Sequence, residues 1–276
     1  MLLSVLTNNC ETWYNLTQKD IQDLESVDNQ LIRQALMTSS KTSVCLMMLD
    51  LGLIPVRYTL CKKRLLYFHH LMTLKDSSLA TQVLHKQMES PIKGDWILSI
   101  HRDIAELDIQ ISAENIQSLT KTSIKTILQK ACSKAAFLHL LNKKKTLSKG
   151  KEIQYNQLKL QNYLQSGNNL SVDQMRIIFM IRSRNLPVKC NFPNQFKDTR
   201  CVISQCRGED SQNDLFYCEY INNTNIISTS YTPEYSDIFG DNVMKQTISM
   251  QILMQKYESR TKILSSPHTA GQGDPV

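Results

Sequence analysis

The stretch that decides the fold is TSIKTILQKACSKAAFLHLLNK, residues 122–143. Apolar residues recur in it every three or four positions, which is the period of an amphipathic α-helix. Lys125, Lys130 and Lys134 are expected on or beyond the margins of the apolar stripe, where their ammonium groups reach solvent. The stripe itself is predicted to consist of Ile124, Ile127, Leu128, Ala131, Ala135 and Leu138.

Outward from this segment, the same period predicts further helices. Thr17 and Asp20 form a capping pair before a helix that ends near Met37, and Ser171 and Gln174 form another. The remaining helices are predicted over residues 43–51, ending at Gly52, from Pro55 to about Leu71, and over 78–89, 95–108, 113–119, 152–165, 172–185 and 242–264. We therefore expect a mainly α fold, a multi-helical bundle-like array with a small irregular cysteine-containing segment near the C-terminus.

Composition agrees with a helical protein. The 276 residues include 8 glycines and 7 prolines, which disfavours a glycine-turned β-sandwich and a proline-rich disordered chain. The mean hydropathy is −0.30, and the apolar runs are shorter than the roughly 18 residues of a membrane span, so we expect no membrane association. The N-terminal residues lack the features of a secretory signal, so the eight cysteines are expected as reduced thiols in the cytoplasm or nucleus.

The texture of the sequence suggests four regions. Helical periodicity runs through residues 1–186, whereas residues 187–232 are rich in Asn, Ser, Thr and Cys and predict short strands and turns. Residues 233–264 return to a helical pattern, and 265–276 are expected to be a disordered tail.

Positive charge is concentrated in the middle of the chain. The net charge is +7, residues 51–75 hold five basic residues and no acid, and residues 121–151 hold nine lysines and no acid. This distribution is typical of a phosphate-binding surface, although a solvated set of lysine-rich helices would look the same. The residues expected to contact phosphates are Arg57, Lys62, Lys63, Arg64, Lys125, Lys130, Lys134, Arg182 and Arg184.

Aromatic residues accompany these basic groups. Tyr58, Tyr67, Phe68 and Phe179 lie near them in the sequence. They could stack on nucleobases, but their helical spacing favours packing in the core.

A cysteine cluster follows in CVISQCRGEDSQNDLFYC, residues 201–218, with the spacing C-x4-C-x7-D-x3-C. Thiolates are preferred zinc ligands, and a short segment without its own core gains folding energy from a metal. The candidate ligands are Cys201, Cys206, Asp214 and Cys218, with Cys190 or water as an alternative to Asp214. Reduced cysteines packed as small hydrophobic residues remain the other interpretation.

Catalytic motifs are missing from the sequence. It contains no adjacent Asp-Asp pair, no phosphate-loop pattern and no G-x-G-x-x-G. Five of the six histidines fall on predicted helices without a nearby nucleophile and orienting partner. We therefore expect a chain without enzymatic activity.

Five blocks of the sequence resemble, in order and spacing, the region downstream of the polymerase palm in reverse transcriptases of non-LTR (LINE-type) retrotransposons. The blocks are NNCETWYNLTQKDIQDLESVDNQLIRQAL (8–36), LDLGLIPVRYTLCKKRLLYFHHLM (49–72), SPIKGDW (90–96), RIIFMIRSRNLPVKCNFPNQF (176–196) and residues 201–218. The resemblance implies a region that helps to hold template RNA and target DNA beside the polymerase.

The chain also departs from that family. The catalytic aspartates would lie upstream of Cys10, so the resemblance implies a fragment without the palm. The family carries a C-x2-C and H-x3-C zinc-knuckle-like motif, whereas here Asp214 stands at the histidine position and two extra residues separate Cys201 from Cys206. These changes imply a degenerate knuckle with weak or lost zinc. The alternative is a helical interaction or structural protein, whose exposed apolar faces meet the missing palm or another protein and which binds no nucleic acid.

Overall fold

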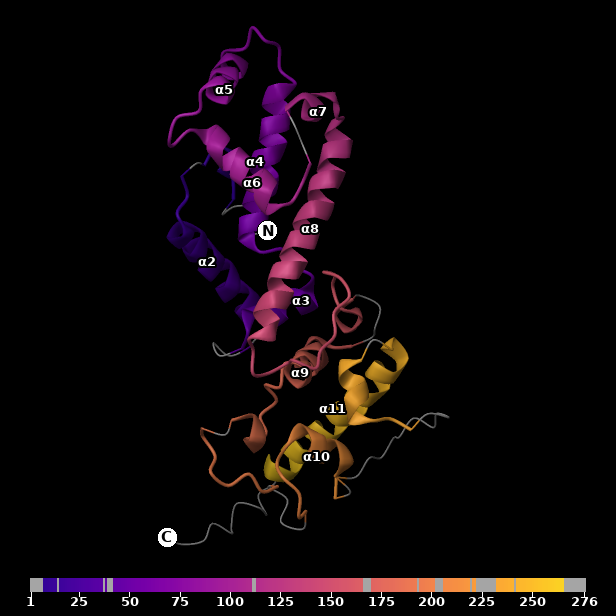
Figure 1. Ribbon diagram of the computed structural model, residues 1–276. Helices are drawn as coiled ribbons and strands as arrows, with labels where there is room; N and C mark the ends of the chain where they lie inside the picture. The colour runs from indigo at the N-terminus through magenta and orange to yellow at the C-terminus, as the bar shows by residue number, and fades with distance from the viewer. Residues whose placement is uncertain are drawn as a thin grey trace. The chain divides into compact units, whose positions relative to one another are not determined.

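The structure is a computed structural model. It describes all residues except 1–6, 14, 37, 39–41, 111–112, 166–169, 193, 202–205, 219, 222–231, 241 and 266–276. In this part of the chain it confirms the mainly helical fold and contains no β-strand (Figure 1). An isolated antiparallel bridge joins Arg200 and Glu209. The predicted tail after Ser265 lies outside the described residues.

The elements follow one another along the chain in the order that Figure 1 shows. The helices are α2 (Gln18–Leu36), α3 (Val44–Leu51), α4 (Val56–Met72), α5 (Leu79–Glu89), α6 (Trp96–Glu106), α7 (Ala113–Ser118), α8 (Lys121–Lys145), α9 (Val172–Arg182), α10 (Gln212–Tyr217) and α11 (Val243–Ser265). Four 3-10 turns complete them: η1 (Cys10–Thr12), η2 (Asn162–Leu164), η3 (Lys189–Asn191) and η4 (Tyr235–Phe239).

Local capping signals predicted several helix ends correctly. The Asp20 carboxylate accepts a hydrogen bond from the Thr17 backbone N–H at 2.7 Å, and the Thr17 hydroxyl accepts one from the Asp20 N–H at 3.2 Å. Ser171 and Gln174 form the same reciprocal box at the start of α9. Because these partners lie three residues apart, the sequence alone specifies them.

Gly52 ends α3 as predicted. Its φ is +65°, and the N–H of Leu53 donates to the carbonyl of Met48 at 2.9 Å. This hydrogen bond, which spans five residues, closes a Schellman-type cap, and such a cap requires a residue in the left-handed conformation just after the helix. Proline 55 is then the N-cap of α4, with φ −53°.

The described residues form two compact units. Unit 1 comprises Met1–Leu36, Met47–Lys145 and Gln157–Lys159. Unit 2 comprises Met37–Leu46, Thr146–Asn156 and Leu160–Val276. This division differs from the boundaries expected after residues 186 and 232, because α9 belongs with α10 and α11 in unit 2.

Helix α4 is the centre of unit 1, where it contacts η1, α2, α5, α6, α7 and α8 (Figure 1). Its apolar residues lie on several sides, so Leu60 and Leu65 are both fully buried although they belong to different faces. The main cluster combines α4 residues such as Phe68 with Ile97 and Ile100 of α6 and with residues of α8. Burial of this helix from several sides organises the whole unit.

The buried row of α8 differs from the predicted stripe. The fully or nearly fully buried residues are spaced by four and are Ile124, Leu128, Cys132, Ala136 and Leu140. Ile127 and Leu138 were predicted to be buried but are 36% and 51% exposed. A row of residues spaced by four is inclined to the helix axis, so a helix packed against this row crosses α8 at an angle. An apolar stripe with a period of 3.5 residues would instead place the two helices nearly side by side.

The helix predicted over residues 152–165 is wrong. This segment contains only η2, and Ile153 and Tyr155 are buried while Glu152 and Gln154 are exposed. Alternation with a period of two is typical of extended chain, and the apolar residues in this stretch matched a helical spacing by coincidence.

Unit 2 contains α9, α10 and α11, and α3 is divided between the two units. α11 contacts η4, α10 and α9, and α9 contacts η2. The strands predicted within residues 187–232 are absent from the described part of that range, which instead contains η3 and α10. The Ser211 hydroxyl caps α10 by accepting from the Asp214 N–H at 3.0 Å, a local S-x-x-D signal that predicts a helix start.

Candidate nucleic-acid interface and cysteine cluster

The lysines of α8 lie at the surface of unit 1. Lys121, Lys125, Lys130 and Lys134 are all exposed. The first two lie on a different side of α8 from the last two, because five residues turn a helix by about 140° beyond a full turn. We use the name lysine face for these four residues together. Lys130 and Lys134 are one turn apart and project opposite to the buried row, because each lies two residues from its members. The described part of the chain provides no hydrogen-bond or ion-pair partner for any of the four, and α8 itself contains no acid.

Two lysines of α4 are half-buried and already hold internal acceptors. The Lys62 ammonium donates to the Gln129 side chain of α8 at 2.5 Å, and that of Lys63 donates to the Thr7 carbonyl at 2.5 Å. An ammonium carries three donors, so each retains further donor capacity. Arg57, also half-buried, forms an ion pair with Glu25 at 3.0 Å.

The structure corrects the expectation for Arg64. It is 7% exposed, and its guanidinium donates to both carboxylate oxygens of Asp103, at 2.6 and 2.7 Å. Burial opposes the charge of this side chain, but the hydrogen bonds and charge of Asp103 raise the pKa of Arg64 above its ordinary value. A buried bidentate pair of this kind is unavailable to phosphate, so Arg64 is a structural residue.

Arg182 is likewise removed from the predicted interface. It is 1% exposed, donates to the Ile238 carbonyl at 3.3 Å and lies over the rings of Tyr155 and Tyr163 at 5.9 and 5.7 Å. Cation–π contacts and a main-chain acceptor occupy its guanidinium inside unit 2. Arg184 is partly exposed but paired with Glu152 at 2.7 Å.

The four aromatic residues pack internally. Tyr58, Phe68 and Phe179 are at most 4% exposed, and the half-buried Tyr67 lies edge-on to Trp96 with ring centroids 5.8 Å apart. Their helical spacing therefore reflects core packing, and none presents a free face for stacking on bases.

A cluster of Cys61, Asp103 and Glu106 lies beside Arg64, and sequence reasoning missed it. One ligand-type atom from each lies within 4.8 Å of the others. These residues do not fit a metal, because the Cys61 thiol donates to Asp103 at 3.2 Å and Arg64 occupies both oxygens of that carboxylate. Burial raises the pKa of Cys61, which keeps the thiol protonated. Cys61 lies 42 and 45 positions before Asp103 and Glu106, so no local spacing could have revealed the cluster.

The cysteine segment of unit 2 begins as a hairpin-like turn. The N–H of Cys201 donates to the Gly208 carbonyl at 3.0 Å, and the N–H of Asp210 donates to the Thr199 carbonyl at 2.7 Å. These bonds pair Cys201 with Gly208, two residues after Cys206. The Asp214 carboxylate accepts from the Glu209 N–H at 2.6 Å and thereby holds α10 against that turn.

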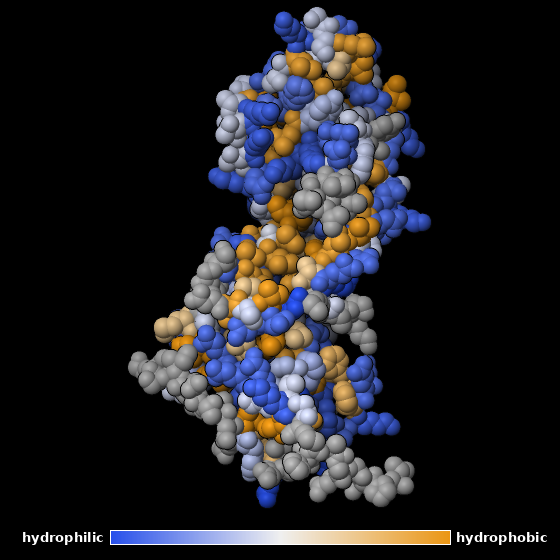
Figure 2. All heavy atoms as spheres, turned by 180° about the vertical axis from the view of Figure 1, so that it is seen from behind, coloured by the Kyte–Doolittle hydropathy of each residue, from blue (hydrophilic) through white to orange (hydrophobic). Residues whose placement is uncertain are grey.

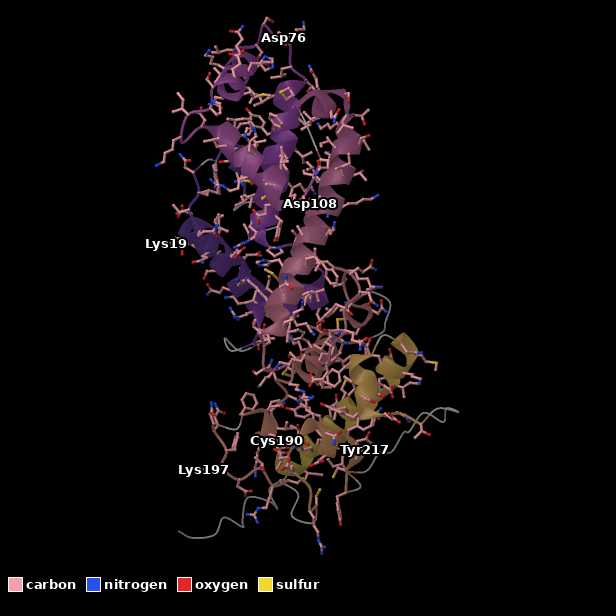
Figure 3. All side chains as sticks on the ribbon, in the orientation of Figure 1. Lys19, Asp76, Asp108, Cys190, Lys197 and Tyr217 are labelled. Atoms are coloured by element: carbon pink, nitrogen blue, oxygen red, sulfur yellow. The ribbon has the colours of Figure 1, made fainter. Side chains whose placement is uncertain are left out.

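The predicted zinc ligands approach one another in pairs. The thiols of Cys206 and Cys218 share a hydrogen bond, and a Cβ atom added to Gly208 would lie 3.3 Å from Asp214 Oδ2 and 3.5 Å from Cys206 Sγ. Within the described chain, no three of the candidate ligands bring their ligand atoms within 4.8 Å of one another. Cys190, the alternative ligand, instead donates to the Glu209 carboxylate at 3.7 Å (Figure 3).

Comparison with known proteins adds no relative: no family model, curated protein or solved structure matches this chain. In the described part of the chain, no single helix has the length and apolar composition needed to cross a membrane; α3 and α4 meet that criterion only as a bent pair.

Proposed function

We propose that this chain binds the phosphate backbone of RNA or single-stranded DNA, without sequence preference, through the lysine face of α8 assisted by Lys62 and Lys63. The resemblance to the post-palm region of non-LTR reverse transcriptases supports a non-catalytic role in holding template RNA or target DNA. The observation that carries the proposal is the set of four exposed lysines on a helix without acids, for which the described chain provides no partner.

Electrostatics explains why such a surface favours phosphates over bases. Each ammonium that neutralises a phosphate releases condensed counterions, which gives affinity independent of sequence. Base recognition requires planar side chains held against base edges, and the arginines expected here are buried or ion-paired instead. Flexible, solvated lysines supply the first kind of contact and not the second.

The test is binding of a fluorescent single-stranded RNA at several salt concentrations. If about five phosphates are neutralised, the logarithm of the binding constant falls with the logarithm of salt concentration at a slope of about −3.5. A flat salt dependence, or no binding at about 50 mM salt, would contradict the proposal.

Matched variants locate the surface. Lys130→Gln/Lys134→Gln removes two phosphate contacts and reduces the magnitude of the slope by about 1.4. The control is Lys19→Gln/Lys93→Gln, which makes the same charge change at exposed lysines outside the lysine face; Figure 3 labels Lys19 on α2. Equal weakening by both double variants would show that net charge, and not this helix, controls binding.

The absence of polymerase motifs makes a second outcome part of the proposal. Purified chain supplied with primer, template, nucleotides and Mg²⁺ is expected to extend nothing, because two-metal phosphoryl transfer needs convergent carboxylates. Extension by protein free of contaminating polymerase would overturn the non-catalytic assignment.

Zinc binding by the cysteine segment is proposed to be weak. Cys206 lies close to Cys218 and to Asp214, but within the described chain no three of the candidate ligands bring their ligand atoms within 4.8 Å of one another. We expect substoichiometric, chelator-labile zinc on Cys201, Cys206, Cys218 and either Asp214 or Cys190. Native mass spectrometry tests this: Asp214→His is expected to tighten binding, and one tightly held zinc in the unmodified chain contradicts a degenerate site.

A protein-interaction role is the second candidate, and the surface of α5 favours it. Leu79 and Val83, one turn apart, are 75% and 50% exposed, and Ile92 just beyond the helix is 71% exposed. Figure 2 shows apolar residues reaching the surface at the end of unit 1 that carries α5. Sedimentation of the wild-type chain and Leu79→Ser/Val83→Ser would detect self-association through this surface, while unchanged RNA binding by the variant would separate the two roles.

A further inference from the structure

Unit 2 contains a cavity of about 380 Å³ that the lysine face does not use. Its walls come from the segment that follows α8, which carries Ser148 and Lys149, from the turn after η3, and from Leu46. This volume lies within the range of cavities that hold small ligands, and such sites combine apolar walls with a few polar groups. Both kinds of lining are present here.

The cavity carries a positive charge, the ammonium group of Lys149. The Lys149 ammonium donates to the Asn191 carbonyl at 2.7 Å and lies 4.8 Å from the centre of the Phe192 ring. The described residues offer it no carboxylate partner, and burial together with the charge of Arg184 lowers the pKa of Lys149. A half-buried ammonium in these surroundings gains most from an anion, because the anion restores the pairing that burial removed.

Neutral polar groups surround this charge. The side chains of Ser148, Asn194 and Gln195 line the cavity, and none has a hydrogen-bond partner within the described chain. The turn that presents the two amides is fixed by the N–H of Gln195 donating to the Phe192 carbonyl at 2.9 Å. Asn and Gln side chains pair with both a donor and an acceptor on one base edge, as adenine presents them.

The backbone also shapes the site. Gly150 has φ +74°, and a Cβ atom there would lie 2.6 Å from the Leu46 Cδ1 atom. The chain therefore turns sharply just after Lys149 with the Leu46 side chain packed against it, and Leu46, Leu147 and Phe192 supply the apolar part of the lining.

We propose that this cavity binds a single nucleotide, with its phosphate on Lys149 and its base between the apolar walls and the amides of Asn194 and Gln195. The nucleotide is either a free nucleoside monophosphate or one unpaired residue of a strand. The site shares no residue with the lysine face, so it stands or fails separately from phosphate-backbone binding.

Titration calorimetry of the full chain with AMP, ribose 5-phosphate, adenosine and inorganic phosphate tests the proposal. AMP is expected to bind one site at least about tenfold more tightly than either adenosine or phosphate alone, because it makes both kinds of contact. Absence of AMP binding, or equal affinity for AMP and phosphate, would overturn the inference.

Three variants then assign the site. Lys149→Gln and Gln195→Ala are each expected to weaken AMP binding about tenfold, and Gln195→Ala removes no side-chain hydrogen bond or ion pair that the described structure contains. Lys197→Gln is the control, because Lys197 is exposed and does not line the cavity (Figure 3). Equal weakening by Lys197→Gln, or no weakening by Gln195→Ala, would contradict the assignment.

Two further measurements show whether the nucleotide is free or part of a strand, and whether the cavity binds it independently of the lysine face on α8. If AMP competes with a short adenine oligonucleotide only in protein carrying Gln195, the cavity takes an unpaired residue of a strand; if AMP binds and does not compete, it takes the free monophosphate. The Lys130→Gln/Lys134→Gln variant is expected to bind AMP normally while losing strand affinity. Loss of AMP binding in that variant would show that the cavity is not a separate site.

Discussion

Units 1 and 2 bury charged side chains in different ways. In unit 1, Arg64 and Asp103 pair with each other between two regular helices, whose main-chain groups are already satisfied. In unit 2, the long cationic side chains reach main-chain carbonyls of irregular segments: Arg182 donates to Ile238, Lys256 to Cys218 and Arg260 to Pro187. Buried carbonyls outside helices need donors, so a region with short helices recruits them from side chains.

This difference between the units predicts which buried ion pair can be replaced by apolar side chains without loss of stability. Asp103 serves Arg64 and a weak thiol donor, whereas Asp210 accepts from Arg260 at 3.1 and 2.8 Å and also from the Lys189 N–H at 2.8 Å. Replacement of a simple pair by apolar residues is often neutral, while replacement of a pair that also satisfies main chain leaves polar groups without partners.

The largest expected effect comes from removing one partner of each pair. Arg64→Met and Arg260→Met each leave a buried carboxylate uncompensated and are expected to lower the free energy of unfolding of their units by about 3–5 kcal/mol. Hydrogen exchange, followed separately in each unit, measures the loss. The double variants separate the two units further: Arg64→Met/Asp103→Leu should recover most of the stability of unit 1, whereas Arg260→Met/Asp210→Leu should not recover that of unit 2. Equal recovery in both units would remove the distinction.

The second prediction tests the packing of unit 1 through α8. Leu128→Ala, at a fully buried position, is expected to cost about 2–5 kcal/mol because it leaves a cavity among tightly packed helices. Leu138→Ala, at a position 51% exposed, should change stability by less than about 0.5 kcal/mol. Urea denaturation of both variants compares the observed i, i+4 row with the stripe expected from the sequence. A large loss from Leu138→Ala would favour the expected stripe.

The stability of unit 1 is expected to depend on pH through the buried side chain of Tyr58. Burial raises the pKa of Tyr58 to about 12 from an ordinary value of 10.0. The contribution of this group is fully present below pH 10 and is lost as pH rises toward 12, because the unfolded chain releases its proton first. Over that interval the wild type should lose about 2 kcal/mol more than Tyr58→Phe. Parallel stability curves for the two proteins would contradict the raised pKa.

The smallest predicted effect lies at a helix start in unit 2. Ser171→Ala removes one half of the capping box of α9 and is expected to cost about 1 kcal/mol, observed as increased exchange of the first amides of that helix. Ser171→Asp keeps an acceptor at the same place and should cost much less. If Ser171→Ala instead increases exchange over all of unit 2, the capping box stabilises the whole unit and not only the first turn of α9, which contradicts the prediction of a local effect.

The sequence by itself determined the features whose partners are close in the chain. The helical class, the two capping boxes and the stop at Gly52 all depend on residues within about five positions of one another, so composition and spacing were sufficient. The concentration of positive charge on residues 121–145 could also be predicted from the sequence, because these residues form one helix.

Only the tertiary structure decided which of the basic residues remain at the surface. Asp103 lies 39 positions from Arg64 and Asp210 lies 50 from Arg260, and a chain fold is needed to bring them within hydrogen-bond distance. The same holds for the tilted row on α8, for the extended course of residues 152–156 and for the cavity around Lys149, where segments distant in sequence meet. Helix-capping hydrogen bonds and apolar periodicity involve residues close in the chain, but the burial of a charge depends on every segment that packs around it.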